Sequence, residues 1–96
     1  MSRVTFIARM TVKEGRDAEF LALMNELADY VKGHEPGTVQ YQMFRLREPR
    51  RFAVIEGFAD EAAAAVHAAS AKLQALVPRI SDCLVGSWEI EYLDPV

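Results

Sequence analysis

The sequence predicts one α+β domain of the ferredoxin-like class, in which an antiparallel sheet carries its helices on one face. Three observations lead to this class. The chain has 96 residues, the size of a single domain, so residues 1–96 are expected to form one unit. Its composition, 51% apolar and 26% charged, is ordinary for a globular protein. Its periodic segments follow the order β-α-β-β-α-β along the chain.

A strand and a helix are predicted in the first third of the chain. Residues 3–12 alternate with the period of a strand, whose apolar face holds Val4, Phe6, Ala8, Met10 and Val12. Apolar residues then recur at helical spacing, namely Phe20, Leu23, Met24, Leu27 and Val31. Gly33 is a typical stop signal, so the helix is expected to end there.

Two further strands are predicted to pair as a hairpin. Pro36 and Gly37 indicate a turn, after which residues 38–47 alternate through Val39, Tyr41 and Met43. The polar residues 47–51 form the hairpin loop. The next strand, residues 52–58, has one face made of Phe52, Val54, Glu56 and Phe58. Glu56 is therefore the one charged residue on an apolar face.

The second half of the chain predicts helices and a last strand. Asp60 is a good N-cap for an alanine-rich helix from Glu61 to about Ser70, with Val66 expected on its buried side. Another helical pattern runs through residues 73–84, where Pro78 must kink the helix or start a new one. Trp88, Ile90 and Tyr92 alternate with polar residues, which predicts the final strand.

The predicted sheet is apolar on both faces. Opposite the main apolar sets lie Ile7, Phe44, Leu46, Ala53 and Ile55. An antiparallel sheet with helices on one side normally exposes its other side to water, and a monomer would leave these side chains there. We therefore expect a homodimer that pairs through the sheet face, although scattered surface hydrophobic residues are the simpler alternative.

Charge and cysteine content exclude several classes of partner. The net charge of −3 gives no attraction to nucleic acid or to anionic lipid, so neither is an expected partner. The lone Cys83 cannot form an internal disulfide, and no apolar run is long enough to cross a bilayer. We expect a cytoplasmic protein whose partner is a small-molecule substrate.

Two titratable residues are the candidate catalytic groups. Burying Glu56 on an apolar face is costly unless it is paired, and its pKa should rise toward the range of a useful base. His67 lies on the helix that should cover this strand, where it could contact Glu56 and exchange protons near neutral pH. The alternatives are a structural ion pair for Glu56 and a packed or solvated imidazole for His67.

Other residues are candidates for holding a substrate. Tyr41, Phe58 and Trp88 lie on apolar strand faces and could hold a flat aromatic ring, although core packing would place them there too. Arg51 belongs to a cluster with Arg45, Arg47 and Arg50 that could bind an anionic group or form a solvated hairpin tip. The histidines and the cysteine have no spacing typical of a metal site, so no metal is expected.

Several motifs together resemble the antibiotic biosynthesis monooxygenase family. They are Glu35-Pro36-Gly37, Tyr41, Arg51-Phe52 through Glu56 and Phe58, Asp60-Glu61, His67, Ser70 and Leu84-Val85-Gly86. The resemblance covers nearly the whole chain and implies a dimeric α+β barrel with a pocket between the sheet and the helices. It also implies chemistry without a cofactor.

The sequence departs from the family pattern at several positions. Arg50 and Phe58 stand where the family often has Asn and Trp, and Ala71-Lys72-Leu73 replaces a frequent Pro-His-Phe. The Asn, Trp and His by which haem-degrading relatives resemble one another are also missing, so haem is not expected.

Three functions remain open at this stage. The first is a cofactor-independent monooxygenase acting on a quinol or anthrone-like aromatic, with Glu56 and His67 moving the proton. The second is an isomerase of a small anionic metabolite, with the arginine cluster holding the anion. The third is a non-catalytic dimeric ligand-binding module, because a fold does not fix a function.

Overall fold

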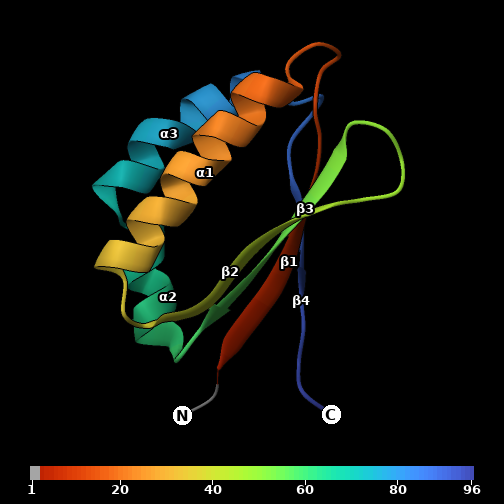
Figure 1. Cartoon of the computed structure of the whole chain (residues 1–96). Coiled ribbons are helices and arrows are strands. Elements are labelled where there is room, and N and C mark those ends of the chain that lie inside the picture. The colour runs from red at the N-terminus through yellow and green to blue at the C-terminus, as the bar shows by residue number, and fades with distance from the viewer. Residues whose placement is uncertain (1–2) are drawn as a thin grey trace.

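The computed structural model describes residues 3–96, which form a four-stranded antiparallel sheet with three helices on one face (Figure 1). In chain order the elements are β1 (Val4–Thr11), α1 (Asp17–His34), β2 (Thr38–Arg45), β3 (Arg51–Phe58), α2 (Glu61–Ala68), α3 (Ala71–Asp82) and β4 (Glu89–Tyr92). The strands lie in the order β2-β3-β1-β4. The predicted ferredoxin-like class is confirmed, with α2 and α3 together in the second helical position.

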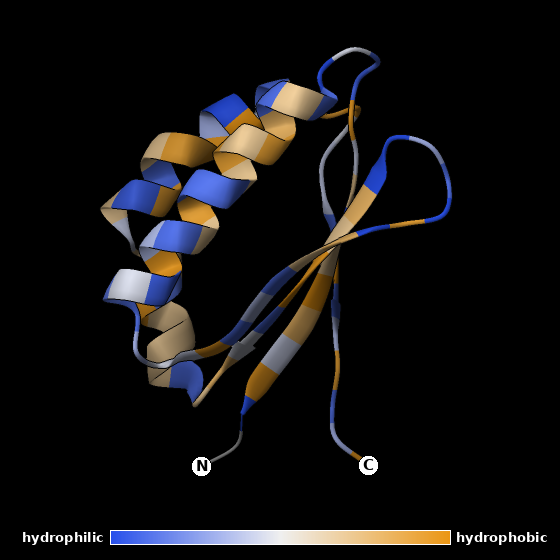
Figure 2. Cartoon of the chain, viewed as in Figure 1, coloured by the Kyte–Doolittle hydropathy of each residue, from blue (hydrophilic) through white to orange (hydrophobic). Residues whose placement is uncertain are grey.

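The hydrophobic core lies between the helices and the inner face of the sheet. Figure 2 colours these helices and strands by the hydropathy of each residue. The buried residues of α1 are the set predicted from helical spacing, namely Phe20, Leu23, Met24, Leu27 and Val31. Phe20 packs on Phe52 of β3, with ring centroids 5.1 Å apart. Burying each such side chain stabilises the fold by roughly 1.5–3 kcal/mol, so α1 is held firmly on the sheet. The sequence predicted that this helix ends at Gly33, but the helix runs one residue further and ends at His34.

A β-bulge changes the predicted face of Val39. In the pairing of β2 with β3, Thr38 lies opposite Phe58 and Gln40 lies opposite Gly57, so Val39 is the extra residue. Its side chain lies on the outer face, where Cγ2 is 3.5 Å from the position that a Cβ atom on Gly57 would occupy. The residue is 46% exposed. Val39 therefore does not share a face with Tyr41, because a bulge reverses the alternation of side chains locally.

The buried side of α2 differs from the prediction. Val66 is 60% exposed, whereas its neighbour His67 is buried. Asp60 caps the helix as predicted, since its carboxylate accepts a hydrogen bond from the Ala63 amide at 2.8 Å. Ala63 and His67 are four residues apart and so lie on one helical face, which packs inward. Hydropathy alone favours Val66 inside, but here the imidazole is the group that finds buried partners.

The second helical pattern forms a single helix that contains Pro78. Helix α3 begins after Ser70, whose hydroxyl accepts a hydrogen bond from the Leu73 amide, and ends at Asp82. A new start at Pro78 is therefore excluded. Leu84 lies beyond the helix and forms an isolated antiparallel bridge with Val12, which ties the end of α3 to the sheet. No helix within residues 3–96 is both long and apolar enough to cross a membrane.

Gly37 is required where the turn before β2 touches α2. A Cβ atom at this position would lie 2.6 Å from the Cβ of Ala63, which is too close for two carbon atoms. We expect Gly37→Ala to push the turn away from α2 and to destabilise the fold by about 1–3 kcal/mol, measured by urea unfolding. Ala63→Gly in the same chain should restore most of this loss.

Gly33 offers a matched control for this substitution. It lies within α1, and nothing lies within 4 Å of the position of an added Cβ. Gly33→Ala should leave stability unchanged or raise it by about 0.5–1 kcal/mol, because alanine is the better helix former. Equal losses in both variants would contradict the close contact at Gly37.

Candidate functional site

Three buried polar residues meet under α2. Among residues 3–96, the buried charged or polar residues are Glu35, Glu56 and His67, with exposures of 6%, 7% and 6%. Glu56 projects from the inner face of β3, His67 from α2, and Glu35 follows the last residue of α1. Charged side chains are rarely buried unless they are paired, and these three pair with one another. We call them the Glu–His–Glu cluster.

The imidazole of His67 lies between the two carboxylates. Its Nδ1 is 2.8 Å from Oε1 of Glu35, a hydrogen-bond distance. Its Nε2 is 3.3 Å from Oε1 of Glu56, which is ion-pair distance. The contact with Glu56 does not have the geometry of a hydrogen bond, so this buried oxygen has no hydrogen-bond partner in the described part of the chain. The Glu56 oxygen that faces the imidazole is therefore shielded from solvent.

The cluster changes the pKa of His67. Burial by itself lowers this pKa, but the carboxylates of Glu56 and Glu35 outweigh burial, and the pKa of His67 is raised above its ordinary value. The ring of Tyr41 lies 5.6 Å from the imidazole, centroid to centroid. Burial raises the pKa of the Tyr41 hydroxyl, and the two carboxylates raise it further. Tyr41 thus stays protonated and can serve as a hydrogen-bond donor.

An apolar cavity of about 210 Å³ ends at this cluster. Its walls come from the sheet and from all three helices: Phe6, Ala8, Met10, Met24, Leu27, Tyr41, Val54, Glu56, His67, Ala68, Leu73, Val77, Ile80, Trp88 and Ile90. Ile90 of β4 faces inward beside Ala8 yet is 48% exposed. The cavity is therefore open to solvent at this edge strand. We call it the inner cavity.

The structure brings most of the sequence-predicted site residues together. Glu56, His67, Tyr41 and Trp88 line the inner cavity. Phe58 is fully buried and supports His67, since their rings lie 5.3 Å apart. Their roles in catalysis or binding stay predictions.

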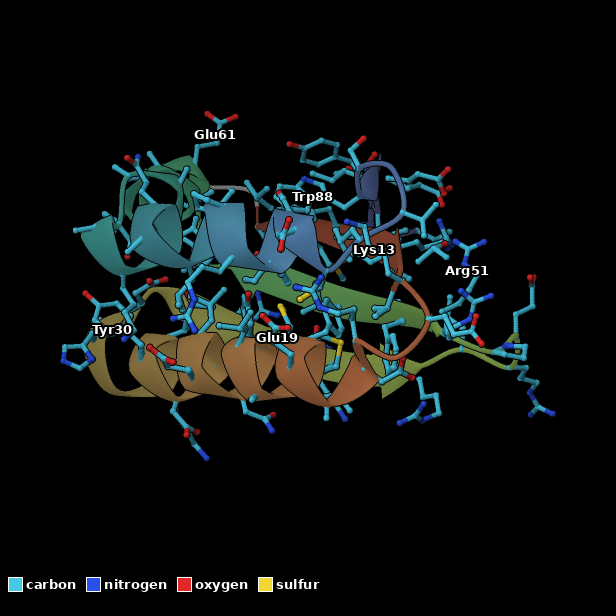
Figure 3. The ribbon with its side chains drawn as sticks, turned by 90° about the horizontal axis from the view of Figure 1, so that it is seen from above. Lys13, Glu19, Tyr30, Arg51, Glu61 and Trp88 are labelled. Carbon is cyan, nitrogen blue, oxygen red and sulfur yellow. The ribbon has the colours of Figure 1, made fainter. Side chains whose placement is uncertain are left out.

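Arg51 is separated from the other predicted site residues. It is the first residue of β3, and its side chain lies on the outer face of the sheet, 3.8 Å from the Glu89 carboxylate. Figure 3 shows Arg51 at the end of the domain opposite Glu61, which begins α2. Arg51 is thus remote from the Glu–His–Glu cluster.

Glu35 is the site residue that sequence reasoning missed. Pro36 and Gly37 indicated a turn, and a glutamate before a turn is ordinarily solvated. The signal available in the sequence was its place in the Glu-Pro-Gly motif of the family resemblance. Glu35 is buried because α2 packs against this turn, and α2 comes about thirty residues later in the sequence.

A pH dependence of stability follows from the raised pKa of His67. A raised folded-state pKa contributes stability below the unfolded value of about 6.5, and this contribution is lost as pH rises through the folded-state value. We expect the free energy of unfolding in urea to fall as pH rises above the unfolded value of about 6.5. His34→Gln should keep this dependence, because His34 lies apart from the cluster, at the end of α1 beside Tyr30. Stability that is flat or rises over this range would contradict the prediction.

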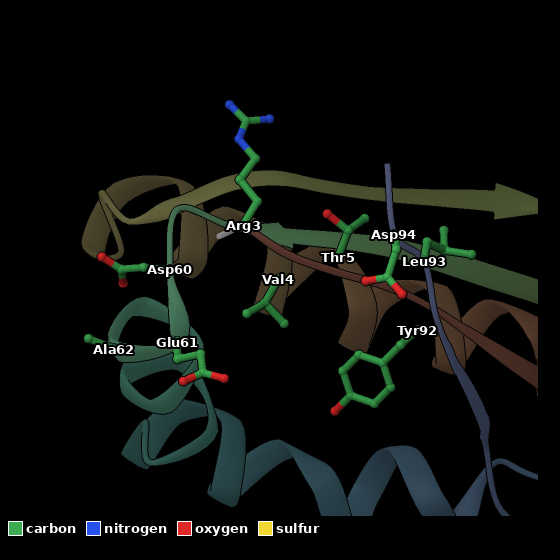
Figure 4. Close-up of a pocket in the computed structure, with 9 residues that line it drawn as sticks. All are labelled: Arg3, Val4, Thr5, Asp60, Glu61, Ala62, Tyr92, Leu93 and Asp94. Atoms are coloured by element: carbon green, nitrogen blue, oxygen red, sulfur yellow. The ribbon is translucent and has the colours of Figure 1, made fainter. Parts of the chain in front are cut away.

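A second hollow, of about 660 Å³, lies between the start of β1, the start of α2 and the C-terminal segment (Figure 4). Its lining includes Asp60, Glu61, Asp94 and Arg3, and Arg3 points away from the carboxylates. It holds no buried titratable group, unlike the inner cavity. The inner cavity is therefore the candidate site, because substrates are usually held in apolar pockets with a few buried polar groups.

The chain is thus an α+β domain with an apolar cavity between sheet and helices and a buried cluster of titratable residues beside it. The antibiotic biosynthesis monooxygenase family matches residues 3–79, most of the chain, and the chain belongs to this family. The family predicted from the sequence motifs is confirmed. No curated protein matches the chain significantly.

Solved structures show the same fold. A protein from Caulobacter crescentus CB15, proposed to be an antibiotic biosynthesis monooxygenase, is 30% identical, with a TM-score of 0.94 over 99% of this chain and 91% of that one. A conserved protein from Methanosarcina mazei Go1 is 25% identical, with a TM-score of 0.89 over 98% of this chain and 93% of that one. SnoaB, a cofactor-independent oxygenase from Streptomyces nogalater, determined in mutant form, is 22% identical, with a TM-score of 0.85 over 99% and 94%. At this identity SnoaB shows a likeness of fold alone.

Proposed function

We propose that the protein is a cofactor-independent monooxygenase that acts on a small hydroxylated aromatic compound. The observation that carries this proposal is the buried Glu56–His67 pair at the end of an apolar cavity. Family membership supports an oxygenase, and the SnoaB structure indicates that this scaffold is compatible with oxygenation without a cofactor. An electron-rich aromatic anion can itself reduce oxygen, so the protein has to remove a proton, stabilise charge and exclude water.

The geometry fits each of these tasks. A substrate hydroxyl that reaches Glu56, whose side chain lines the inner cavity, can give its proton to this carboxylate. The His67 imidazolium and the Tyr41 hydroxyl, both lining the cavity, can stabilise the aromatic anion. In the overall reaction one atom of O₂ enters the ring and the other leaves as water, and the substrate supplies all the electrons.

The cavity volume favours a compact substrate. At about 210 Å³ the inner cavity is smaller than the roughly 300–1,000 Å³ of pockets for drug-sized ligands. It is larger than a cavity of about 150 Å³ that accepts benzene. Quinols of one or two rings therefore fit better than an anthrone of three rings, with Trp88 and the methionines against the ring faces.

One observation favours a second candidate function. His67 already lies at ion-pair distance from Glu56, and a ligand-binding module without catalysis could use the same pair only for structure. An isomerase that holds an anion with the arginine cluster has less support, because no arginine within residues 3–96 lines the inner cavity.

Oxygen uptake tests the proposal directly. Purified protein treated with a chelator is mixed with monocyclic and bicyclic quinols, and with an anthrone, in an oxygen electrode. We expect uptake above the uncatalysed rate with at least one quinol, unchanged by the chelator, together with a hydroxyquinone product. If the protein binds quinols, seen by quenching of Trp88 fluorescence, but takes up no oxygen, the binding-module alternative is correct. If it neither binds nor oxidises them, both are wrong.

The outer sheet face supports assembly as a homodimer, which we propose as the state in the cytoplasm. Phe44 is 38% exposed there, and Ile7, Leu46, Ala53 and Ile55 surround the same hollow. The helices leave this face uncovered (Figure 1). A second copy would remove this apolar surface from water.

The oligomeric state gives a direct prediction. We expect wild-type protein at micromolar concentration to sediment as a dimer, and Ile55→Asp to sediment as a folded monomer, because a carboxylate in an apolar interface is costly. Val66→Asp is the control, since Val66 is exposed on α2 and lies on the helical side of the domain. A monomeric wild type would contradict the assembly.

A further inference from the structure

Glu35 is fixed in place by its own backbone. It follows α1, and its amide donates to the carbonyl of Val31 at 2.9 Å. Its carbonyl accepts from the Thr38 amide at 3.0 Å across the turn that contains Pro36 and Gly37. The close packing of Gly37 on Ala63 then sets this turn against α2, one helical turn before His67. The backbone of Glu35 therefore has little freedom relative to the imidazole.

The side chain of Glu35 is held through one carboxylate oxygen, Oε1, whereas its Oε2 is buried without a hydrogen-bond partner among residues 3–96. Its Oε1 accepts a hydrogen bond from the Thr38 hydroxyl at 3.0 Å and lies 2.8 Å from Nδ1 of His67. The side chain is only 4% exposed and does not line the inner cavity. Glu35 therefore cannot touch a substrate in this cavity, and any effect it has on chemistry must pass through His67.

We propose that Glu35 is a positioning residue, which holds Nδ1 of His67 so that Nε2 faces Glu56 and the inner cavity. This role rests on the proposed function, since it orients the proton-handling pair. A carboxylate that binds one nitrogen of an imidazole fixes the ring orientation and decides which nitrogen is left to exchange a proton. Thr38 supports the arrangement, because its hydroxyl orients the Glu35 carboxylate.

The proposal explains why two carboxylates flank one histidine. The titratable groups that lie against the imidazole are Glu35, Glu56 and Tyr41. Because Nδ1 of His67 lies 2.8 Å from Glu35, the ring is turned so that its Nε2 lies 3.3 Å from Glu56. The two carboxylates favour the imidazolium form of His67. When Glu56 takes a proton from the substrate, the imidazolium remains to stabilise the anion that forms, and Glu35 keeps its own charge throughout.

Nuclear magnetic resonance of the resting protein tests this role without a substrate. In ¹⁵N-histidine-labelled protein, the chain has only two imidazoles, so His34→Gln assigns the signals of His67. We expect the His67 titration midpoint to fall in Glu35→Gln, which keeps the side-chain shape but removes the charge. Thr38→Val should move it in the same direction by less, and Thr38→Ser should restore it. An unchanged His67 titration in Glu35→Gln would overturn the proposal.

Activity provides a second and separate readout. With a quinol that the wild type oxidises, Glu35→Gln should lower kcat on the order of 10²-fold with little change in KM, because Glu35 orients the reacting pair but does not contact the substrate. A kcat equal to that of the wild type would overturn the positioning role. If the wild type oxidises nothing, the proposed function fails, while the titration still decides whether Glu35 holds His67.

Discussion

His67→Ala should lower the free energy of unfolding by about 3–5 kcal/mol at pH 7, the largest loss of stability expected from one substitution in this site. The reason is that His67 is the partner of two buried carboxylates, Glu35 and Glu56, at 2.8 and 3.3 Å. Without the imidazole, two like charges remain in an apolar environment with no cation between them. Urea unfolding followed by circular dichroism measures the loss, which is a large share of the 5–15 kcal/mol that typically holds a domain folded.

A triple variant separates the loss of the ion cluster from the loss of packing. When Glu35, Glu56 and His67 are all replaced by leucine, no buried charge is left unpaired, and buried ion pairs replaced by apolar residues are often neutral in stability. This variant should therefore be more stable than His67→Ala. If His67→Ala stays within 1 kcal/mol of the wild type, the carboxylates are hydrated or protonated and the cluster does not support the fold.

The fold was predictable because its signals are local and repeated. The alternation in β1 and the helical spacing of Phe20 to Val31 each combine several residues with one period, so a single exception changes little. The wrong predictions were those for single residues that depart from the local pattern. Val39 leaves its predicted face because of a bulge, and Val66 is exposed because His67 takes the buried side of α2. Hydropathy does not determine the placement of Val39 or of Val66. Each placement depends on contacts with another element, which the local sequence pattern does not contain.

The candidate site was predictable only in part, for the same reason. Glu56 was found because a charge on an apolar strand face breaks a local pattern. Glu35 breaks no pattern, since it stands in a polar turn and is buried only when α2 packs against Gly37. Arg51 shows the converse, because a cluster of arginines in the sequence does not say which face of the sheet each one occupies. Long-range packing decides both cases.

Glu56→Gln should lower the kcat for quinol oxidation by about 10²–10⁴-fold, because an amide keeps the shape of the side chain but cannot accept the substrate proton. The loss is expected in kcat rather than in KM, since the carboxylate acts on the proton in the transition state and the apolar walls of the cavity still bind the ring. Stopped-flow or electrode measurements of oxygen uptake, with circular dichroism to confirm the fold, give both constants.

Glu26→Gln is the matched control for this substitution. Glu26 is also a glutamate, but it is exposed on α1, on the helical side of the domain, where it pairs with Lys72, so its loss should leave kcat unchanged. A Glu56→Gln rate within about threefold of the wild type, a change of less than about 0.7 kcal/mol in the barrier, would show that Glu56 is not the base. The proton would then have to go to His67, which requires a neutral Nε2. Its raised pKa opposes that state near neutral pH, so the rate of this variant should then increase as pH rises.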